Sequence, residues 1–106
     1  MSEDRVAQFR EVVGLYPDDP VARFGLATAC LEAGRGEEAV AEFREVLRLK
    51  PDYTAAYRGL GRALERLGRI EEAKAVYREG IALAPKTGDL QTGKEMEVFL
   101  KRLERG

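Results

Sequence analysis

The chain has 106 residues, a length that suits one domain with a modest hydrophobic core. Lys and Arg number 18 against 19 Asp and Glu, so no broad positive field is present to attract nucleic acid or an anionic membrane. With no histidine and one cysteine, Cys30, the sequence cannot form a His/Cys zinc site, a Ser-His-Asp triad or an internal disulfide. We expect no catalytic, cofactor-binding or metal-binding residues, a buried Cys30, and a cytoplasmic location because a lone cysteine favours a reducing compartment.

Residues 1–17 are predicted to form one helix. Phe9, Val12 and Leu15 match Phe43, Val46 and Leu49 at an offset of 34 residues. The chain therefore opens with the second helix of a repeat, that is, with half a repeat. We expect Phe9 and Val12 to dock on the first hairpin.

The middle of the chain is a tandem repeat. Residues 20–53 align with residues 54–87 without a gap and share 14 identical positions. Apolar residues recur with the helical period of 3.6 in each copy, and a glycine-containing turn divides each copy into two. Each copy is thus predicted to be a helical hairpin, with helices over residues 20–33 and 36–49, then 54–67 and 70–83.

Several residues mark where these helices begin and end. Asp19 can cap the first hairpin with Pro20 in its first turn, and Asp52 offers a similar cap for the second hairpin. Pro51 and Pro85 are expected to end the second helix of each hairpin, because proline cannot continue the backbone hydrogen bonding.

The tail, residues 88–106, departs from the period. Its apolar residues are expected on one side of a last helix that caps the array: Leu90, Met96, Phe99, Leu100 and Leu103. Gly93 is expected to weaken this helix. The complete prediction is an all-α, single-domain solenoid of helical hairpins over residues 1–106, with an N-terminal half repeat and a C-terminal capping helix.

The repeat resembles the tetratricopeptide repeat (TPR), a 34-residue helix-turn-helix unit. The second copy carries the matching residues Tyr57, Leu60-Gly61, Leu64, Ala73, Tyr77 and Pro85, and the first carries Arg23, Leu26-Ala27, Cys30, Ala39, Phe43 and Pro51. Arg23 departs from the family, which usually has a large apolar residue there. Small residues at these positions let helices approach closely, and Phe43 and Tyr77 fill the layer between hairpins.

The resemblance implies a right-handed superhelix whose concave face holds peptide segments of other proteins, without catalysis. The family's groove positions fall on Phe24, Thr28 and Leu31, which we call the apolar shelf. They also fall on Arg58, Arg62 and Arg66, which we call the basic stripe. The expected partner is a protein or peptide with acidic side chains and apolar anchors.

Other interpretations of these residues stay open at this point. The basic stripe suits a solvated helix face as well, with Glu65 paired to Arg62 or Arg69. Phe24 and Leu31 suit packing on the N-terminal helix or on a neighbouring chain. The family subset that grips chaperone tails needs asparagines, and this chain has none, so that activity is not expected.

The alternative function is structural self-assembly. Two and a half repeats lie near the lower limit for a stable solenoid, and two short arrays can complete each other's ends. A homo-oligomer is the expected product of that alternative.

Overall fold

The structure, a computed structural model, describes residues 2–106. Its helices are α1 (Ser2–Leu15), α2 (Pro20–Glu32), α3 (Gly36–Leu49), α4 (Thr54–Arg66), α5 (Ile70–Thr87) and α6 (Leu90–Arg105). No strand occurs within residues 2–106. The all-α expectation is therefore confirmed, and the helices fall close to their predicted positions.

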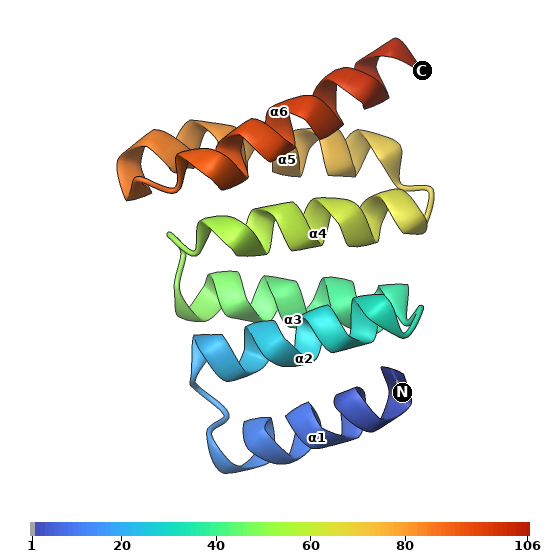
Figure 1. Cartoon of the computed structure of the whole chain (residues 1–106), viewed down its shortest axis with the longest axis vertical. Coiled ribbons are helices and arrows are strands. Elements are labelled where there is room, and N and C mark those ends of the chain that lie inside the picture. The colour runs from blue at the N-terminus through green and yellow to red at the C-terminus, as the bar shows by residue number, and fades with distance from the viewer. Residues whose placement is uncertain (1) are drawn as a thin grey trace.

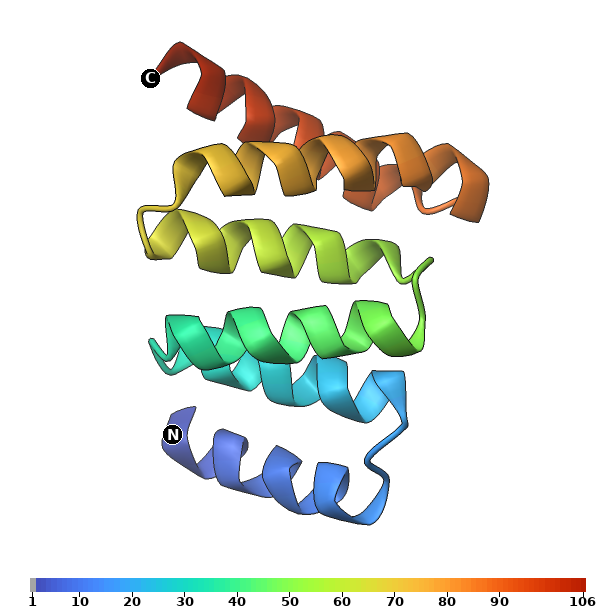
Figure 2. The same ribbon diagram turned by 180° about the vertical axis from the view of Figure 1, so that it is seen from behind.

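The helices stack one upon the next along a molecule of 40 × 28 × 19 Å. Each helix packs against the helices before and after it in sequence. In addition, α2 contacts α4, and α4 contacts α6. Figure 1 shows α1 and α6 at opposite ends of the stack, with α2 and α6 in front of α3 and α5. In Figure 2, seen from behind, α3 and α5 lie in front. One side of the stack is thus formed by α2 and α6, and the other by α3 and α5.

The cap of the first hairpin is as predicted, whereas that of the second is not. The Asp19 carboxylate accepts a hydrogen bond from the Val21 backbone N–H at 2.9 Å, with Pro20 in the first turn. At the start of α4 the cap position is Tyr53, which makes no side-chain cap bond. The prediction for Asp52 was wrong because its carboxylate, one residue too early, lies 3.2 Å from the Lys50 amine instead.

The ends of the helices also differ from the sequence prediction. The two tight turns use Gly34 and Gly68 with φ of 78° and 75°, so α2 and α4 each stop one residue early. The expectation that Pro85 ends α5 was wrong, because this helix continues to Thr87 and ends at the left-handed Gly88. Proline removes one backbone hydrogen bond, and packing of α5 on α6 retains the helix despite that loss.

Gly93 provides the close approach of these two helices. A Cβ atom built on Gly93 would lie 2.6 Å from the Cβ of Ala84, so any side chain there would push α6 away from α5. The residue expected to weaken α6 is therefore the one that lets it pack.

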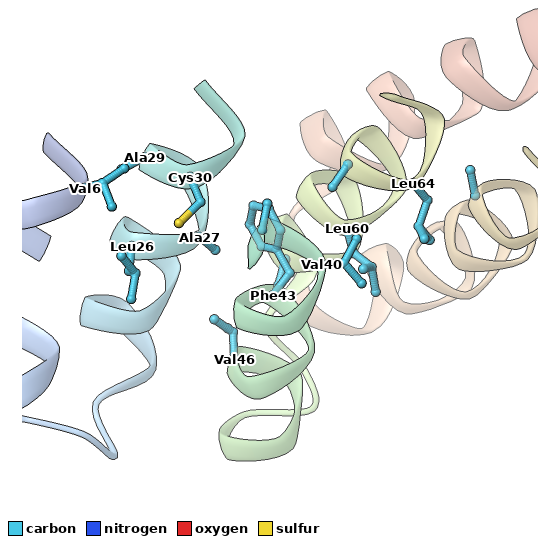
Figure 3. Packing of buried hydrophobic residues seen from close by; sticks show 14 of the residues in the cluster. Val6, Leu26, Ala27, Ala29, Cys30, Val40, Phe43, Val46, Leu60 and Leu64 are labelled. Carbon is cyan, nitrogen blue, oxygen red and sulfur yellow. The ribbon is translucent and has the colours of Figure 1, made fainter. Parts of the chain in front are cut away.

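The core runs through the whole stack. Figure 3 shows Phe43 between the residues of α2 and those of α4. Phe43 and Tyr77 are buried with almost no exposed surface, and Cys30 is buried as expected. A Cβ on Gly61 would meet the Tyr77 ring, and one on Gly59 would meet the Phe43 ring. At both positions the glycine, which has no side chain, leaves the space that the aromatic ring occupies.

The N-terminal helix docks through Phe9, as expected, and also through two valines that the prediction left out. Val6 and Val13 are buried against α2, and Phe9 is half-buried. The expectation that Val12 docks was wrong, since 40% of its surface is exposed. Its equivalent Val46 is fully buried because α3 packs between α2 and α4, whereas α1 has a helical neighbour only in α2.

The C-terminal helix covers α5 and part of α4. Met96 is fully buried, and Phe99, Leu100 and Leu103 pack on the core from its edge. The assignment of Leu90 to this side was wrong, because 57% of it is exposed. Leu90 lies six residues before Met96, which places it about 120° away around the helix. No stretch of residues 2–106 forms a helix that is long and apolar enough to cross a membrane.

Candidate functional site

One open hollow of about 430 Å³ lies along α2, α4 and α6. Its wall includes the whole apolar shelf and the whole basic stripe: Phe24, Thr28, Leu31, Arg58, Arg62 and Arg66. The structure therefore brings all six predicted residues to one place. The remaining wall includes Phe43 from α3, and Glu95 and Phe99 from α6.

The apolar part of the wall is a set of aromatic rings. The Phe24 ring meets Phe43 edge to face, with 5.8 Å between centroids, and stacks on Tyr53 at 5.0 Å. Phe24 thus packs on α3 and on the turn before α4. It stays half-buried, so part of its ring faces the hollow.

Each arginine of the basic stripe is held by a different interaction. Arg58 forms an ion pair with Glu95 of α6. The Arg62 guanidinium lies over the Phe99 ring, 4.4 Å from its centroid. Arg66 donates a hydrogen bond from Nη1 to the Leu31 carbonyl at 2.7 Å. These contacts fix the three side chains along the hollow.

Two of these charges are not neutralised. Within residues 2–106, neither Arg62 nor Arg66 forms an ion pair with a carboxylate. The wall around them also holds aromatic rings and two carboxylates, those of Glu32 and Glu95, which are paired with Arg5 and Arg58. Such a surface attracts a negative group and an apolar group together.

Glu65 has partners other than the expected arginines. Its carboxylate accepts a hydrogen bond from the Tyr77 hydroxyl and lies 3.5 Å from the Arg102 guanidinium. Pairing with Arg62 or Arg69 was therefore wrong, because α6 brings Arg102 closer. Burial, together with this hydrogen bond to Glu65, raises the pKa of Tyr77 far above its usual value.

Arg23, the departure from the repeat pattern, links three segments. Its guanidinium lies 3.0 Å from the Glu42 carboxylate of α3 and donates to the Pro17 carbonyl at 3.0 Å. It thereby fixes the turn between α1 and α2 to the first hairpin. An apolar residue could not make these bonds.

The part that α6 plays in the hollow was missed from the sequence. Glu95 and Phe99 lie in the tail, where the repeat period fails, so no alignment of the copies could place them. The alternation of charged and apolar residues predicted only a capping helix. Which groove residues that helix touches depends on its crossing angle over α4 and α5.

The described residues hold no cluster suited to a metal ion, counted as three or more neighbouring His, Cys, Asp or Glu side chains. Cys30 is buried, and this burial raises the pKa of its thiol above the ordinary value. A neutral, buried thiol is a poor nucleophile and a poor ligand.

Comparison with known proteins places the chain in a family. Two tetratricopeptide repeat models match it, one over residues 31–95 and one over residues 6–54. The chain belongs to the tetratricopeptide repeat family. The resemblance inferred from the 34-residue period is thus confirmed, together with the solenoid of helical hairpins that it implies.

Solved structures agree with this assignment. A protein of Bordetella parapertussis has 30% identity and a TM-score of 0.83, with 94% of this chain and 87% of that one covered. A TPR domain protein of Salinibacter ruber has 33% identity and a TM-score of 0.76, with coverage of 83% and 89%. The TPR2B domain of yeast Sti1, solved in complex with pHsp70, shares the fold at a TM-score of 0.92 with 14% identity, covering 98% of this chain and 83% of that one. A comparison with curated proteins gives no match.

Proposed function

We propose that this TPR protein is a non-enzymatic interaction module that binds a peptide segment of a partner protein in the hollow along α2, α4 and α6. The observation that carries the proposal is the pairing of an aromatic wall at Phe24 with two arginines, Arg62 and Arg66, that lack a carboxylate partner within residues 2–106. The expected ligand carries an apolar side chain and a nearby carboxylate. A cytoplasmic location is part of the proposal, and the single cysteine of the chain supports it because thiols stay free in a reducing compartment.

Relatives of the same fold bind peptides, which supports this assignment. The yeast domain named above was solved with pHsp70, and the first TPR of Spaghetti was solved with the HSP90 peptide SRMEEVD. Those ligands are not transferred to this chain, since the chain has no asparagine for the clamp that chaperone tails require. A different acidic segment is the expected ligand.

The aromatic residues and the arginines of the wall are expected to contribute differently to the binding free energy. Two exposed ion pairs contribute at most about 2 kcal/mol, whereas a micromolar complex needs about 8 kcal/mol. Apolar burial against Phe24 and its neighbours must therefore supply most of the affinity. The arginines select acidic partners and accelerate their encounter.

A peptide library displayed on phage and selected on the purified protein tests the proposal. Selected peptides should combine Asp or Glu with a large apolar residue. Their affinity should fall at all salt concentrations in Phe24→Ala, and in a salt-dependent manner when Arg62→Glu and Arg66→Glu are combined. Lys86→Glu, at an exposed lysine outside the hollow, is a control for charge reversal elsewhere on the surface. Equal binding by all variants would move the site away from this hollow.

A further inference from the structure

The N-terminal end of the stack exposes an apolar helix face. Val12 is 40% exposed, although its repeat equivalent Val46 is fully buried. Leu15 and Tyr16, which follow Val12 at the end of α1, are 75% and 61% exposed. In the next unit, α2 packs against the corresponding face of α3. The exposed end of α1 thus has the surface of a helix that lacks one helical neighbour.

This face of α1 is also acidic. Asp4 and Glu11 lie seven residues apart, on the side away from the buried Val6 and Val13, and both are exposed. Neither forms an ion pair within residues 2–106. The other charged side chains of α1 are less available, since Glu3, Arg5 and Arg10 pair with residues of α2, α3 and the turn between them.

The opposite end of the stack has the opposite charge. Lys94, Lys101 and Arg105 lie on the outer side of α6, away from Met96, with one carboxylate, Glu97, between the two lysines; none of the four has an ion-pair partner in the described chain. Leu90 and Val98 accompany them on this side and are 57% and 60% exposed. With three basic side chains against one acidic, the C-terminal end is therefore basic on balance and apolar, whereas the N-terminal end is acidic and apolar.

We propose that the outer face of α6 in one copy docks on the exposed face of α1 in a second copy, head to tail. The two helices would run antiparallel, as α2 and α3 do. In that register the start of α6, with Leu90, lies beside the end of α1, with Leu15. Lys94 then lies near Glu11, and Lys101 lies near Asp4.

The spacing of the charges supports this register. Asp4 and Glu11 are separated by seven residues, as are Lys94 and Lys101, and seven residues span about 10.5 Å along either helix. The helices are also of similar length, with 14 residues in α1 and 16 in α6. Both charge pairs can therefore form at once.

The contact joins two different surfaces. Two joined copies therefore still have one free α1 face and one free α6 face, to which further copies can bind. Such a heterologous contact gives a ring if the rotation closes and an open chain if it does not. Since both surfaces lie at the ends of the stack, the hollow along α2, α4 and α6 remains open in the assembly. Self-association and peptide binding are thus separate properties, each with its own test.

Sedimentation velocity of the full chain, from about 10 µM to about 1 mM, tests the proposal, because heterologous contacts add copies until a ring closes, or without limit in an open chain. The mean sedimentation coefficient should rise with protein concentration. It should fall again at about 500 mM salt, where exposed charge pairs are screened. A monomer at every concentration and salt would overturn the proposal and leave the α1 face to a different protein.

Two charge-reversal variants identify the surfaces. Asp4→Lys with Glu11→Lys, and Lys94→Glu with Lys101→Glu, should each be monomeric alone, because each then presents two ends of like charge. An equimolar mixture of the two should associate again, since opposite charges then meet at each contact. Association of either variant alone at the wild-type level would show that these charges do not form the contact and would overturn the head-to-tail arrangement.

Two controls accompany these variants. Glu79→Lys, at an exposed carboxylate of α5 away from both ends, should leave self-association unchanged. Circular dichroism melts should match those of the wild type for every variant, because the substituted side chains are exposed. A change in Glu79→Lys equal to that of the end variants would mean that net charge alone governs association, which also overturns the proposal.

Discussion

Replacing Gly61 with alanine should destabilise the protein, although alanine is the better helix former. In an open helix this change is favourable by about 1 kcal/mol. Here the new Cβ would lie 2.6 Å from Cζ and 2.7 Å from Cδ1 of Tyr77, and closer still to Cε1. Tyr77 cannot move aside, because its ring is fully buried and its hydroxyl donates to Glu65.

Overpacking of this kind costs about 1–3 kcal/mol, and the van der Waals overlap here is severe enough to exceed the gain in helix propensity. We expect a net loss of about 1–2 kcal/mol. For a domain of this size, 1 kcal/mol lowers Tm by about 4–8 °C, which thermal circular dichroism measures readily.

Gly14 offers a matched control, because it also lies in a helix and nothing stands within 4 Å of a Cβ built there. Gly14→Ala should increase the free energy of unfolding by about 0.5 kcal/mol, since Gly14 lies near a helix end, and should therefore raise Tm slightly. A Gly61→Ala protein that melts at or above the wild-type temperature would refute the argument. A Gly61→Ala penalty that persists unchanged in a Tyr77→Leu background would show that the ring is not the obstacle.

Three further predictions follow from the packing and the hydrogen bonds. Deletion of residues 90–106 uncovers α5 and should lower the stability by several kcal/mol or cause association, seen in thermal melts and light scattering; an unchanged monomer would mean that α6 does not pack. Phe9→Ala should cost about 2 kcal/mol by urea denaturation, less than for a fully buried ring, and a cost below about 0.5 kcal/mol would indicate a frayed α1. The raised pKa of Tyr77 contributes stability that is complete below the unfolded-state pKa near 10 and is lost as the pH rises above it. Urea unfolding between about pH 9 and 11 should therefore show a shallower loss of stability in Tyr77→Phe than in the wild type, and equal slopes would contradict the assignment.

Much of the fold was predictable because the sequence contains two copies of the same repeat. The hairpin pattern, the Asp19 cap and the buried Phe43, Tyr77 and Cys30 follow from local rules of helix periodicity, capping and turn formation. The six groove residues came together because stacked hairpins bring equivalent positions to one side of the stack.

Where the repeat is incomplete, prediction failed for one shared reason. Val12 has the sequence position of a buried residue, yet α1 lacks the neighbour that would cover it. Pro85 has the sequence of a helix end, yet the packing of Ala84 on Gly93 holds α5 and α6 together beyond it. In both cases the outcome depends on which helix lies alongside, and no local pattern contains that information.

The sequence by itself determined the unit, since a 34-residue period with small residues at the close approaches specifies a helical hairpin and its way of stacking. Only the tertiary structure decided what each charge does. Arg58, Arg62 and Arg66 are alike in sequence, and the path of α6 gives Arg58 an ion pair and Arg62 an aromatic ring, while Arg66 reaches a backbone carbonyl of α2. A long charged side chain interacts with the polar, charged or aromatic groups that lie within a few ångströms of it. Its role is therefore determined only by how the helices pack.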